Sequence, residues 1–229
     1  MSRTEVRIPI AKGAFISASQ DLPAQPRGLV MFAHGSGSSR MSPRNQFVAQ
    51  VLRDAGFGTF LLDLLTEQED ALDRQTAELR FDIDLLADRL VTATRWVRQQ
   101  TGLGSVPLGY FGASTGAAAA LVAAAALPTS VAAIVSRGGR PDLAGEYLLA
   151  VRAPTLLIVG GADAQVIMLN RRAMESLRVE HELVIVPGAT HLFEEPGALE
   201  AVARLAREWF VRQFTALERS STPPGAMSS

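Results

Sequence analysis

Short apolar runs alternate with amphipathic segments along the chain. The strand candidates, in chain order, are EVRIPI, AFISAS, GLVMFAHG, FGTFLLDLL, PLGYFGAS, VAAIVSRGG, PTLLIVGGAD and HELVIVPGAT. All but the first two are continuous runs rich in Val, Ile, Leu and Phe, as expected for strands that are covered on both faces. The first two are predicted to form a hairpin that turns near residues 11–13.

The segments between these strands are predicted to be helices, because their apolar residues recur at helical spacing. One helix is expected through residues 45–56, with Ser42 as its cap, Pro43 in its first turn and Gly56 as its stop. A second helix is expected over residues 82–102. A third, near the C-terminus, has an apolar face formed by Leu199, Val202, Leu205, Trp209, Phe210, Phe214 and Leu217.

The alternation of strands and helices predicts an α/β fold, with a parallel sheet covered by helices on both faces. No internal repeat or linker interrupts the pattern, so residues 1–218 are expected to form one domain. The Pro-, Ser- and Gly-rich end of the chain predicts a disordered tail over residues 219–229. The charged stretch 66–80 fits either a surface helix or a mobile loop, and the sequence does not decide between them.

The composition excludes several kinds of chemistry. The formal net charge of −1 gives no reason to expect nucleic acid or an anionic membrane as a partner. The chain contains no cysteine, which excludes disulfides, thiolate metal sites and a cysteine nucleophile. No apolar run approaches the ~20 residues of a membrane span, and the N-terminus lacks the apolar core of a signal peptide. A soluble, cytoplasmic protein without a metal is expected, and its oligomeric state is not readable from the sequence.

A serine lies between glycines at a predicted strand-to-helix junction. GASTG, residues 112–116, follows the apolar run PLGYF and precedes the alanine-rich stretch AAAALVAAAAL. Gly112 and Gly116 would relieve the crowding of a sharp turn, because they carry no Cβ. The turn would place the Ser114 hydroxyl beside the N-terminus of a helix, where negative charge is favoured. This pattern is typical of a nucleophile, although the same five residues also fit an ordinary tight turn.

The groups that such a serine needs follow it in the chain. Asp163 comes directly after PTLLIVGGA, and His191 comes directly after HELVIVPGAT. Functional groups gather at the carboxyl ends of parallel strands, so the three side chains are expected at one edge of the sheet. In this interpretation His191 takes the Ser114 proton and returns it to the leaving group, while Asp163 orients the imidazole. Asp163 could instead cap the following helix, or do both.

Backbone N–H groups near the serine are expected to bind the oxyanion of a tetrahedral intermediate. The predicted oxyanion hole consists of Thr115, which follows the nucleophile, and Ser36 in the HGSGS loop (34–38), with Gly37 as the alternative to Ser36. His34 is expected to be structural and to fix this loop by hydrogen bonds.

The chain resembles the α/β-hydrolase superfamily, and within it the dienelactone-hydrolase-like branch. The resemblance covers nearly the whole chain and rests on HGSGS (34–38), GASTG (112–116), GGAD (160–163) and GATHLF (188–193), in this order. It implies an eight-stranded, mostly parallel sheet and cofactor-free hydrolysis through an acyl-enzyme. Dienelactone hydrolases proper use a cysteine nucleophile, so their substrate does not carry over to Ser114. Many members carry a helical lid between the sixth and seventh strands, where this chain has room for about one short helix.

Arginines are predicted in loops at the same edge of the sheet. They are Arg40 and Arg44 after the HGSGS loop, and Arg137 and Arg140 in SRGGR. They could bind a carboxylate or a phosphate of the substrate through paired hydrogen bonds. They could equally form structural ion pairs, with Asp142 or Glu67 as candidate partners. The sequence leaves both interpretations open.

The leading hypothesis is a serine hydrolase that cleaves small carboxylic esters or lactones, with Ser114, Asp163 and His191 as its catalytic triad. The alternative from another class is a non-catalytic scaffold or binding module with the same fold. An acyltransferase or a perhydrolase would use the same triad, because water and other nucleophiles compete for one acyl-enzyme. The sequence does not separate these activities from hydrolysis.

Overall fold

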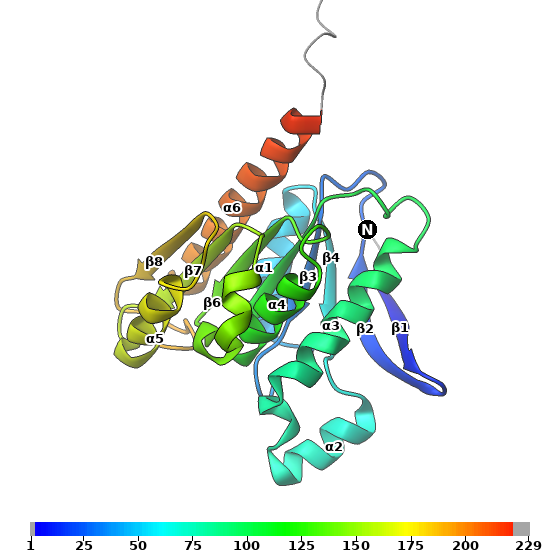
Figure 1. The fold of residues 1–229 in the computed structure, drawn as a ribbon, viewed down its shortest axis with the longest axis horizontal. Coiled ribbons are helices and arrows are strands. Elements are labelled where there is room, and N and C mark those ends of the chain that lie inside the picture. Colours follow the sequence, from blue (N-terminus) through cyan, green and yellow to red (C-terminus); the bar gives the residue numbers. More distant parts are fainter. Residues whose placement is uncertain (1–2, 222–229) are drawn as a thin grey trace, which may run out of the picture.

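A mixed sheet of eight strands organises the structure, a computed structural model that describes residues 3–221 (Figure 1). The strands are β1 (Thr4–Ala11), β2 (Ala14–Asp21), β3 (Leu29–Ala33), β4 (Gly58–Leu62), β5 (Leu108–Ala113), β6 (Ala133–Arg137), β7 (Thr155–Gly160) and β8 (His181–Val186). Their spatial order is β1-β2-β4-β3-β5-β6-β7-β8. β2 pairs antiparallel with both β1 and β4, and every other neighbouring pair is parallel. The prediction of an eight-stranded, mostly parallel sheet is confirmed.

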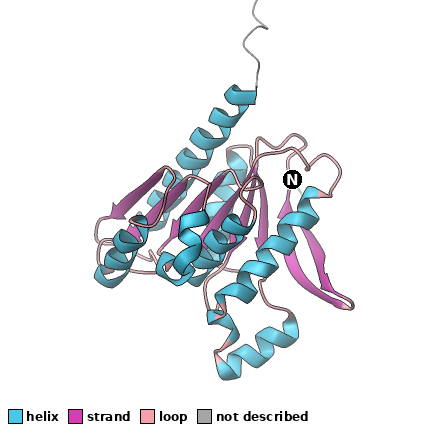
Figure 2. Cartoon of the chain, in the orientation of Figure 1, coloured by secondary structure: helices cyan, strands magenta, loops and turns pink. Residues whose placement is uncertain are grey.

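Helices cover both faces of the sheet (Figures 1 and 2). They are α1 (Pro43–Asp54), α2 (Glu67–Thr76), α3 (Ile83–Arg98), α4 (Thr115–Ala126), α5 (Ala164–Met174) and α6 (Ala198–Ser221), with two 3-10 helices, η1 (Leu79–Phe81) and η2 (Pro141–Ala150). α1 and α6 pack together on one face, whereas α3, α4, η2 and α5 form a layer on the other. Within residues 3–221, no helix has the length and apolar character that crossing a membrane requires.

Alternate residues of the central strands supply two buried cores, one beneath each helix layer. On β3, Met31 lies in the core under α3 and α4, whereas Phe32 lies in the core under α1 and α6. Tyr110 and Phe111 of β5 divide in the same way. Because both faces are covered, the central strands are mostly apolar, with Thr59 of β4 and with Ser136 and Arg137 of β6 among the exceptions.

Local signals fix the ends of several elements. Ser42 caps α1, since its Oγ accepts a hydrogen bond from the Asn45 amide at 3.3 Å. Gly56, with a φ of 88°, follows the end of this helix. Gly13, with a φ of 79°, turns the hairpin between β1 and β2. The predicted boundaries of the hairpin and of the first helix are therefore confirmed.

For the charged stretch 66–80 the sequence left open a surface helix or a mobile loop, and the structure shows a helix, α2. Thr66 and Glu69 make a capping box that starts α2. Arg80 then ties the following 3-10 helix back to α2, because its amide and its Nε donate to the Asp73 carboxylate at 3.0 and 2.7 Å. The capping box is a local sequence signal, so it could have decided this assignment in advance.

Two further expectations concern the segment after β6 and the end of the chain. Between β6 and β7 the chain forms only the short helix η2, as the spacing predicts. The predicted tail over residues 219–229 begins as helix, because α6 continues to Ser221. Residues 222–229 lie outside the described part of the chain.

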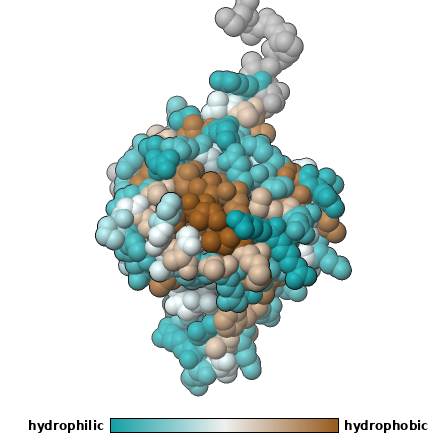
Figure 3. Space-filling model, turned by 90° about the vertical axis from the view of Figure 1, so that its left-hand side faces the viewer, coloured by the Kyte–Doolittle hydropathy of each residue, from teal (hydrophilic) through white to brown (hydrophobic). Residues whose placement is uncertain are grey.

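β8 is an edge strand of the sheet. Its apolar residues Leu183, Val184 and Ile185 are only half-buried, and a hydrophobic region is visible on this side of the molecule (Figure 3). An open apolar strand edge is the kind of surface on which chains can associate.

Candidate active site

Ser114 lies at a tight turn between β5 and α4. Its backbone adopts φ 51° and ψ −121°, which residues other than glycine rarely adopt. Flanking glycines permit the turn: a Cβ on Gly112 would lie 2.4 Å from the Ala117 Cα, and one on Gly116 would lie 2.3 Å from the Ala33 carbonyl oxygen. No side chain fits at such distances, so the two glycines are needed for steric reasons. The turn has the geometry of a nucleophile elbow.

Three side chains meet at the carboxyl edge of the sheet. Ser114 follows β5, Asp163 follows β7 and His191 lies in the loop after β8. The His191 Nδ1 lies 2.7 Å from the Asp163 Oδ2, and its Nε2 lies 3.4 Å from the Ser114 Oγ. When Nδ1 donates its proton to Asp163, Nε2 is left as an acceptor that faces the Ser114 hydroxyl. The structure thus places the three predicted residues in one hydrogen-bonded series, from Asp163 through His191 to Ser114. The contact between His191 and Ser114 is at the long end of the hydrogen-bonding range.

Asp163 uses its two carboxylate oxygens differently. Oδ2 faces His191, whereas Oδ1 accepts a hydrogen bond from the Val166 amide at 3.3 Å and caps α5. Both contacts that the sequence allowed for Asp163 are therefore present. Because the helix cap fixes the carboxylate, it also fixes the direction in which the imidazole is held.

The loop that carries His191 is held from several sides. The Thr190 side chain and amide donate to Glu195, at 2.6 and 3.0 Å, and these hydrogen bonds lower the pKa of Glu195. Phe193 adopts a φ of 57° and anchors the loop in the core under α1 and α6. A Cβ on Gly138 would lie 3.1 Å from the His191 carbonyl oxygen, so the turn after β6 also approaches this loop closely. Sequence reasoning did not single out Phe193 or Glu195, whose only signal is their position just after the histidine.

The HGSGS loop passes directly beside the elbow. A Cβ on Gly35 would lie 3.0 Å from the Ser114 Cβ, so this approach needs glycine. Ser36 lines the same cavity as Ser114, and Gly37 is not among the described residues that line it. Thr115 begins α4, where the N–H groups of the first turn have no acceptor within the helix. The oxyanion-binding role of Ser36 and Thr115 stays a prediction, with both residues beside the serine.

His34 lies behind the HGSGS loop and is engaged at both ring nitrogens. Its Nδ1 donates to the Gly35 carbonyl at 2.9 Å, and its Nε2 accepts from the Leu64 amide at 3.2 Å. This arrangement requires a neutral ring with its proton on Nδ1. Loss of hydration lowers the pKa of His34, although the carboxylates of Asp63 and Asp70 oppose the shift. These contacts agree with the structural role that the sequence predicts.

Three of the four candidate arginines make ion pairs, and two of these three lie outside the wall of the cavity that contains Ser114. Arg40 pairs with Glu5 and Asp63, and Arg140 pairs with Asp142. The pairing of Arg140 with Asp142 is one of those considered from the sequence. The guanidinium groups of these two residues are thus occupied by carboxylates of the chain itself.

The other two arginines line the cavity that contains Ser114. The expectation that they lie in loops is wrong: Arg44 is in the first turn of α1 and Arg137 is the last residue of β6. The predicted strand VAAIVSRGG already contained Arg137, and a helix capped by Ser42 already placed Arg44 in its first turn, so the loop assignment disagreed with both patterns. Arg44 also donates a hydrogen bond to Glu194 at 2.8 Å. Arg44 therefore combines an ion pair to Glu194 with a place in the cavity wall, whereas the Arg137 side chain makes no ion pair among residues 3–221.

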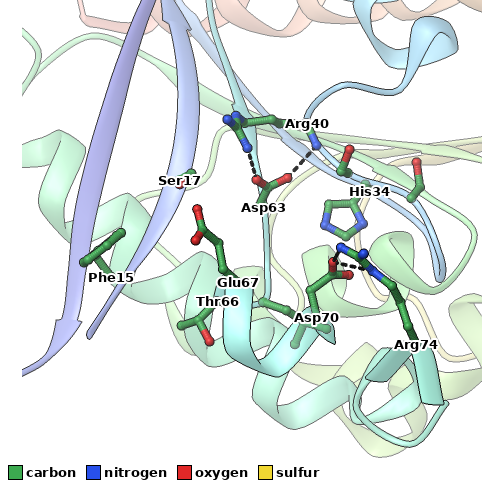
Figure 4. Close-up of a pocket in the computed structure, with 12 residues that line it drawn as sticks. Phe15, Ser17, His34, Arg40, Asp63, Thr66, Glu67, Asp70 and Arg74 are labelled. Carbon is green, nitrogen blue, oxygen red and sulfur yellow. Dashed lines mark hydrogen bonds and ion pairs between the residues drawn. The ribbon is translucent and has the colours of Figure 1, made fainter. Parts of the chain in front are cut away.

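Of the cavities that adjoin the HGSGS loop, the two larger ones share Ser38. The cavity with the serine has a volume of about 180 Å³, and it is lined by Gly35, Ser36, Ser38, Arg44, Ala113, Ser114, Arg137, His191 and Leu192. The other, about 240 Å³, lies beside β2 and α2 (Figure 4). Four of its charged side chains pair with one another, Arg40 with Asp63 and Arg74 with Asp70. The cavity of about 180 Å³ contains Ser114 and His191 and is the candidate active site.

The strand order, the elbow after β5 and the cluster at the carboxyl edge define an α/β-hydrolase fold. The model of the dienelactone hydrolase family matches residues 14–220. The chain therefore belongs to the dienelactone hydrolase family.

Solved structures agree with this assignment. A dienelactone hydrolase from Anabaena variabilis is 54% identical, with a TM-score of 0.90 over 93% of this chain and 98% of that chain. Two more distant structures share the fold. Est1E from Butyrivibrio proteoclasticus has a TM-score of 0.76 at 15% identity, over 92% of this chain and 99% of its own. A dienelactone hydrolase-like promiscuous phosphotriesterase from metagenomic libraries has a TM-score of 0.73 at 17% identity, over 93% and 99%.

Curated relatives come from two strains of Mycobacterium tuberculosis, CDC 1551 and H37Rv. They are 60% identical to this chain over 190 residues and carry the provisional name phosphoribosyl transferase. The match covers 83% of this chain but 42% of the relatives. The chain therefore spans less than half the length of these proteins.

Proposed function

We propose that this chain is a serine hydrolase of small carboxylic esters or lactones. Ser114 is the nucleophile, His191 is the general base and acid, and Asp163 orients His191. The observation that carries the proposal is the hydrogen-bonded chain from Asp163 through His191 to Ser114, set on a strained elbow. Backbone strain of this kind is found where a site needs it, and membership of the dienelactone hydrolase family supports a hydrolytic use.

The reaction proceeds in two half-reactions. His191 Nε2 accepts the Ser114 proton while Oγ attacks the ester carbonyl carbon. The oxyanion of the resulting tetrahedral intermediate accepts hydrogen bonds from the backbone amides of Thr115 and Ser36. His191 then gives the proton to the alcohol oxygen, the C–O bond breaks, and an acyl group remains on Ser114. Water repeats the same steps, which releases the acid and restores the serine.

The size of the cavity supports small substrates. Its volume of about 180 Å³ is below the roughly 300–1,000 Å³ of sites that enclose drug-sized ligands. The segment between β6 and β7 forms only η2, so access to Ser114 does not depend on the opening of a helical lid there. Short acyl groups and small lactone rings fit these dimensions.

The test is Ser114→Ala, assayed with a short-chain p-nitrophenyl ester. Turnover should fall to background, because the hydroxyl is the attacking group, while the melting temperature stays near that of the parent. Ser105→Ala, at an exposed serine outside the cavity, is the matched control and should retain full turnover. Unchanged hydrolysis by Ser114→Ala would overturn the assignment.

Two readouts separate the competing activities. Covalent labelling by a fluorophosphonate probe should occur in the parent protein and disappear in Ser114→Ala, and absence of labelling in folded parent protein favours a non-catalytic scaffold. Product analysis with added alcohol or hydrogen peroxide shows whether the acyl-enzyme also transfers its acyl group to these acceptors. The name of the mycobacterial relatives does not alter the proposal, because the matched region is only 42% of their length.

A further inference from the structure

The cavity beside β2 and α2, with a volume of about 240 Å³, adjoins the candidate active site. The HGSGS loop contributes His34 and Ser38 to its wall, and Ser38 also lines the cavity with Ser114. Neither cavity alone reaches the roughly 300–1,000 Å³ of sites that enclose drug-sized ligands, but the two together do. One molecule that occupies both cavities would therefore be enclosed as ligands of that size commonly are.

The ionic groups of the larger cavity are mostly neutralised by one another. Arg40 donates to both oxygens of Asp63, through its amide at 2.7 Å and through its guanidinium. Arg74 pairs with Asp70 one turn away on α2. A charged ligand would compete with these ion pairs, and separating a partly buried pair leaves one charge without a partner. The pairs therefore favour an uncharged occupant.

Glu67 is the exception among the carboxylates of this cavity. It is the first residue of α2, and its side chain points into the cavity (Figure 4). Within residues 3–221 it makes no ion pair and no side-chain hydrogen bond, so it pairs with none of the four candidate arginines. The N-terminal end of a helix stabilises negative charge, so Glu67 does not need a cation there. Its oxygens are free to accept hydrogen bonds from a ligand.

Neutral polar groups and an aromatic ring complete the wall. In the described part of the chain, the hydroxyls of Ser17 and Ser38 have no hydrogen-bond partner, and the Asp70 Oδ1 has no donor. Phe15 on β2 adds an apolar surface, and its ring is fixed by Arg7, whose guanidinium carbon lies 3.0 Å from the ring centroid. This mixture suits a ligand with several hydroxyl groups and apolar C–H faces, because each hydroxyl both donates and accepts.

The wall shared by the two cavities belongs to the loop beside the nucleophile. The Gly35 carbonyl accepts hydrogen bonds from the His34 ring at 2.9 Å and from the Ser38 amide at 3.2 Å. A Cβ on Gly35 would lie 3.0 Å from the Ser114 Cβ. A ligand group that packs against His34 and Ser38 therefore holds the loop that carries Ser36, a proposed oxyanion donor. Binding energy gained in the larger cavity is then expressed in kcat as well as in KM.

We propose that the larger cavity binds an uncharged polyhydroxylated group, a sugar ring or a polyol, which belongs to the same molecule as the ester that Ser114 cleaves. The proposal rests on the proposed function and adds its substrate class, short-chain acyl esters of sugars or polyols. Hydroxyls of the alcohol part donate to Glu67 and Asp70, while the acyl carbonyl lies against Ser114. The C–O bond to the sugar oxygen breaks, His191 protonates that oxygen, and water then releases the acid. Glu67 is in this view a specificity-determining residue.

The competing occupant is a cation, such as an ammonium group that pairs with Glu67. The two occupants differ in what they need at position 67. A cation needs negative charge, whereas a hydroxyl needs a hydrogen-bond acceptor, which the amide oxygen of glutamine also supplies. Glu67→Gln should therefore keep the recognition of a polyol, and Glu67→Leu should remove it.

The first experiment compares kcat/KM by acetate release for two hydroxylated esters, methyl 6-O-acetyl-α-D-glucopyranoside and 1-O-acetylglycerol, and for cyclohexylmethyl acetate, which has a ring without hydroxyls. In the parent, a hydroxylated ester should exceed cyclohexylmethyl acetate by roughly 10- to 100-fold, the range of hydrogen bonds to a charged group. Glu67→Leu should lower this ratio about ten-fold and Glu67→Gln less than about three-fold. Gln68→Leu, at the exposed neighbouring position outside the cavity, is the matched control and should keep the parent ratio.

Acetylcholine and its neutral isostere 3,3-dimethylbutyl acetate test the competing occupant in the same assay. A parent ratio near one between the hydroxylated esters and cyclohexylmethyl acetate would overturn the inference. A preference for acetylcholine over its isostere that Glu67→Gln abolishes would overturn it as well, in favour of a cation site.

The second experiment measures binding without turnover. Methyl α-D-glucopyranoside and glycerol are titrated into Ser114→Ala and into the double variant Ser114→Ala/Glu67→Leu, and saturation-transfer NMR follows the ligand protons. Binding that Glu67→Leu removes supports the polyol site even if the parent hydrolyses no ester, in which case the proposed function fails alone. Equal binding by the two variants, or binding by neither, overturns the inference and leaves the proposed function standing wherever simple esters are hydrolysed.

Discussion

The backbone amide of Ser114 donates a hydrogen bond to the carbonyl oxygen of Arg137 at 3.2 Å. The proposed nucleophile and the buried cation are therefore joined through the main chain as well as sharing a cavity. The carbonyl oxygen of Ser114 in turn accepts a hydrogen bond from the Arg140 amide at 3.1 Å. The segment 137–140 thus clamps the elbow at both polar groups of one residue, and this clamp holds the strained backbone in place.

Arg137→Met should leave the free energy of unfolding unchanged or raise it by about 1–3 kcal/mol. Burial has lowered the folded-state pKa of Arg137 to about 10, so the charged form costs stability at neutral pH. Urea unfolding at pH 7 measures the effect. The control is Arg80→Met, which strips Asp73 of its partner and should destabilise the protein. A loss in Arg137→Met as large as in that control would mean that Arg137 is structural.

Gly116→Ala should destabilise the protein by roughly 3 kcal/mol or more and abolish turnover. The added Cβ would lie 2.3 Å from the Ala33 carbonyl oxygen, and a backbone atom of a central strand cannot move aside. Thermal unfolding followed by circular dichroism checks the prediction. Gly104→Ala places its Cβ 3.3 Å from the nearest atom, and its melting temperature should change little. Similar stability of the two variants would show that the elbow tolerates a side chain.

Asp163→Asn should lower kcat by roughly 10²- to 10⁴-fold while changing stability by less than about 1 kcal/mol. The amide oxygen can still accept from the Val166 amide and cap α5, but an amide nitrogen facing His191 Nδ1 favours the wrong tautomer. Asp163→Ala should lose both catalysis and the cap, which adds about 0.5–2 kcal/mol of destabilisation. Steady-state kinetics with parallel unfolding curves separates the two losses. Full activity in Asp163→Asn would remove this residue from the mechanism.

The stability contributed by Asp73 should depend on acidity. Burial alone would raise the pKa of this carboxyl, but hydrogen bonds from the Arg80 amide and guanidinium outweigh it and lower the pKa below 3.8. The contribution is therefore complete above about pH 4 and is lost as the pH falls through the lowered folded-state value. Unfolding curves of the parent and Asp73→Asn should differ by roughly 1–2 kcal/mol at pH 7 and converge at lower pH. Glu146→Gln, at an exposed carboxylate, should show no such convergence.

The succession of strands along the chain and the grouping of Ser114, Asp163 and His191 at one edge could be predicted, because both depend on local patterns. Apolar runs mark the strands, and a polar residue just after a parallel strand must lie at the carboxyl edge. Apart from Arg140, whose neighbour Asp142 was a candidate partner, the partners of the arginines could not be predicted, because they depend on which distant segments fold together. Arg44 meets Glu194 across 150 positions of sequence.

The lack of an ion-pair partner for Arg137 among residues 3–221 could not be predicted from the sequence either. Its unpaired state follows from the positions of all the surrounding carboxylates, and no local motif encodes it. For Asp163 the sequence left two roles open, as cap of the following helix and as partner of His191. The structure shows both contacts, because each carboxylate oxygen makes one of them.

The close packing of helix α4 limits which positions near Ser114 can accept a larger side chain. Every residue from Thr115 to Ala124 is buried, and most are alanines, so the helix that follows the serine has no face with room for a larger side chain. Larger side chains in α4 are therefore not a route to new substrates for this chain. Changes of specificity have to come from the walls of the cavity, such as Ser38 and the exposed Leu192, which lie outside the packing behind the nucleophile. In a saturation library screened for folded protein, positions 115–124 should reject larger side chains, whereas the exposed positions of the cavity wall should accept them.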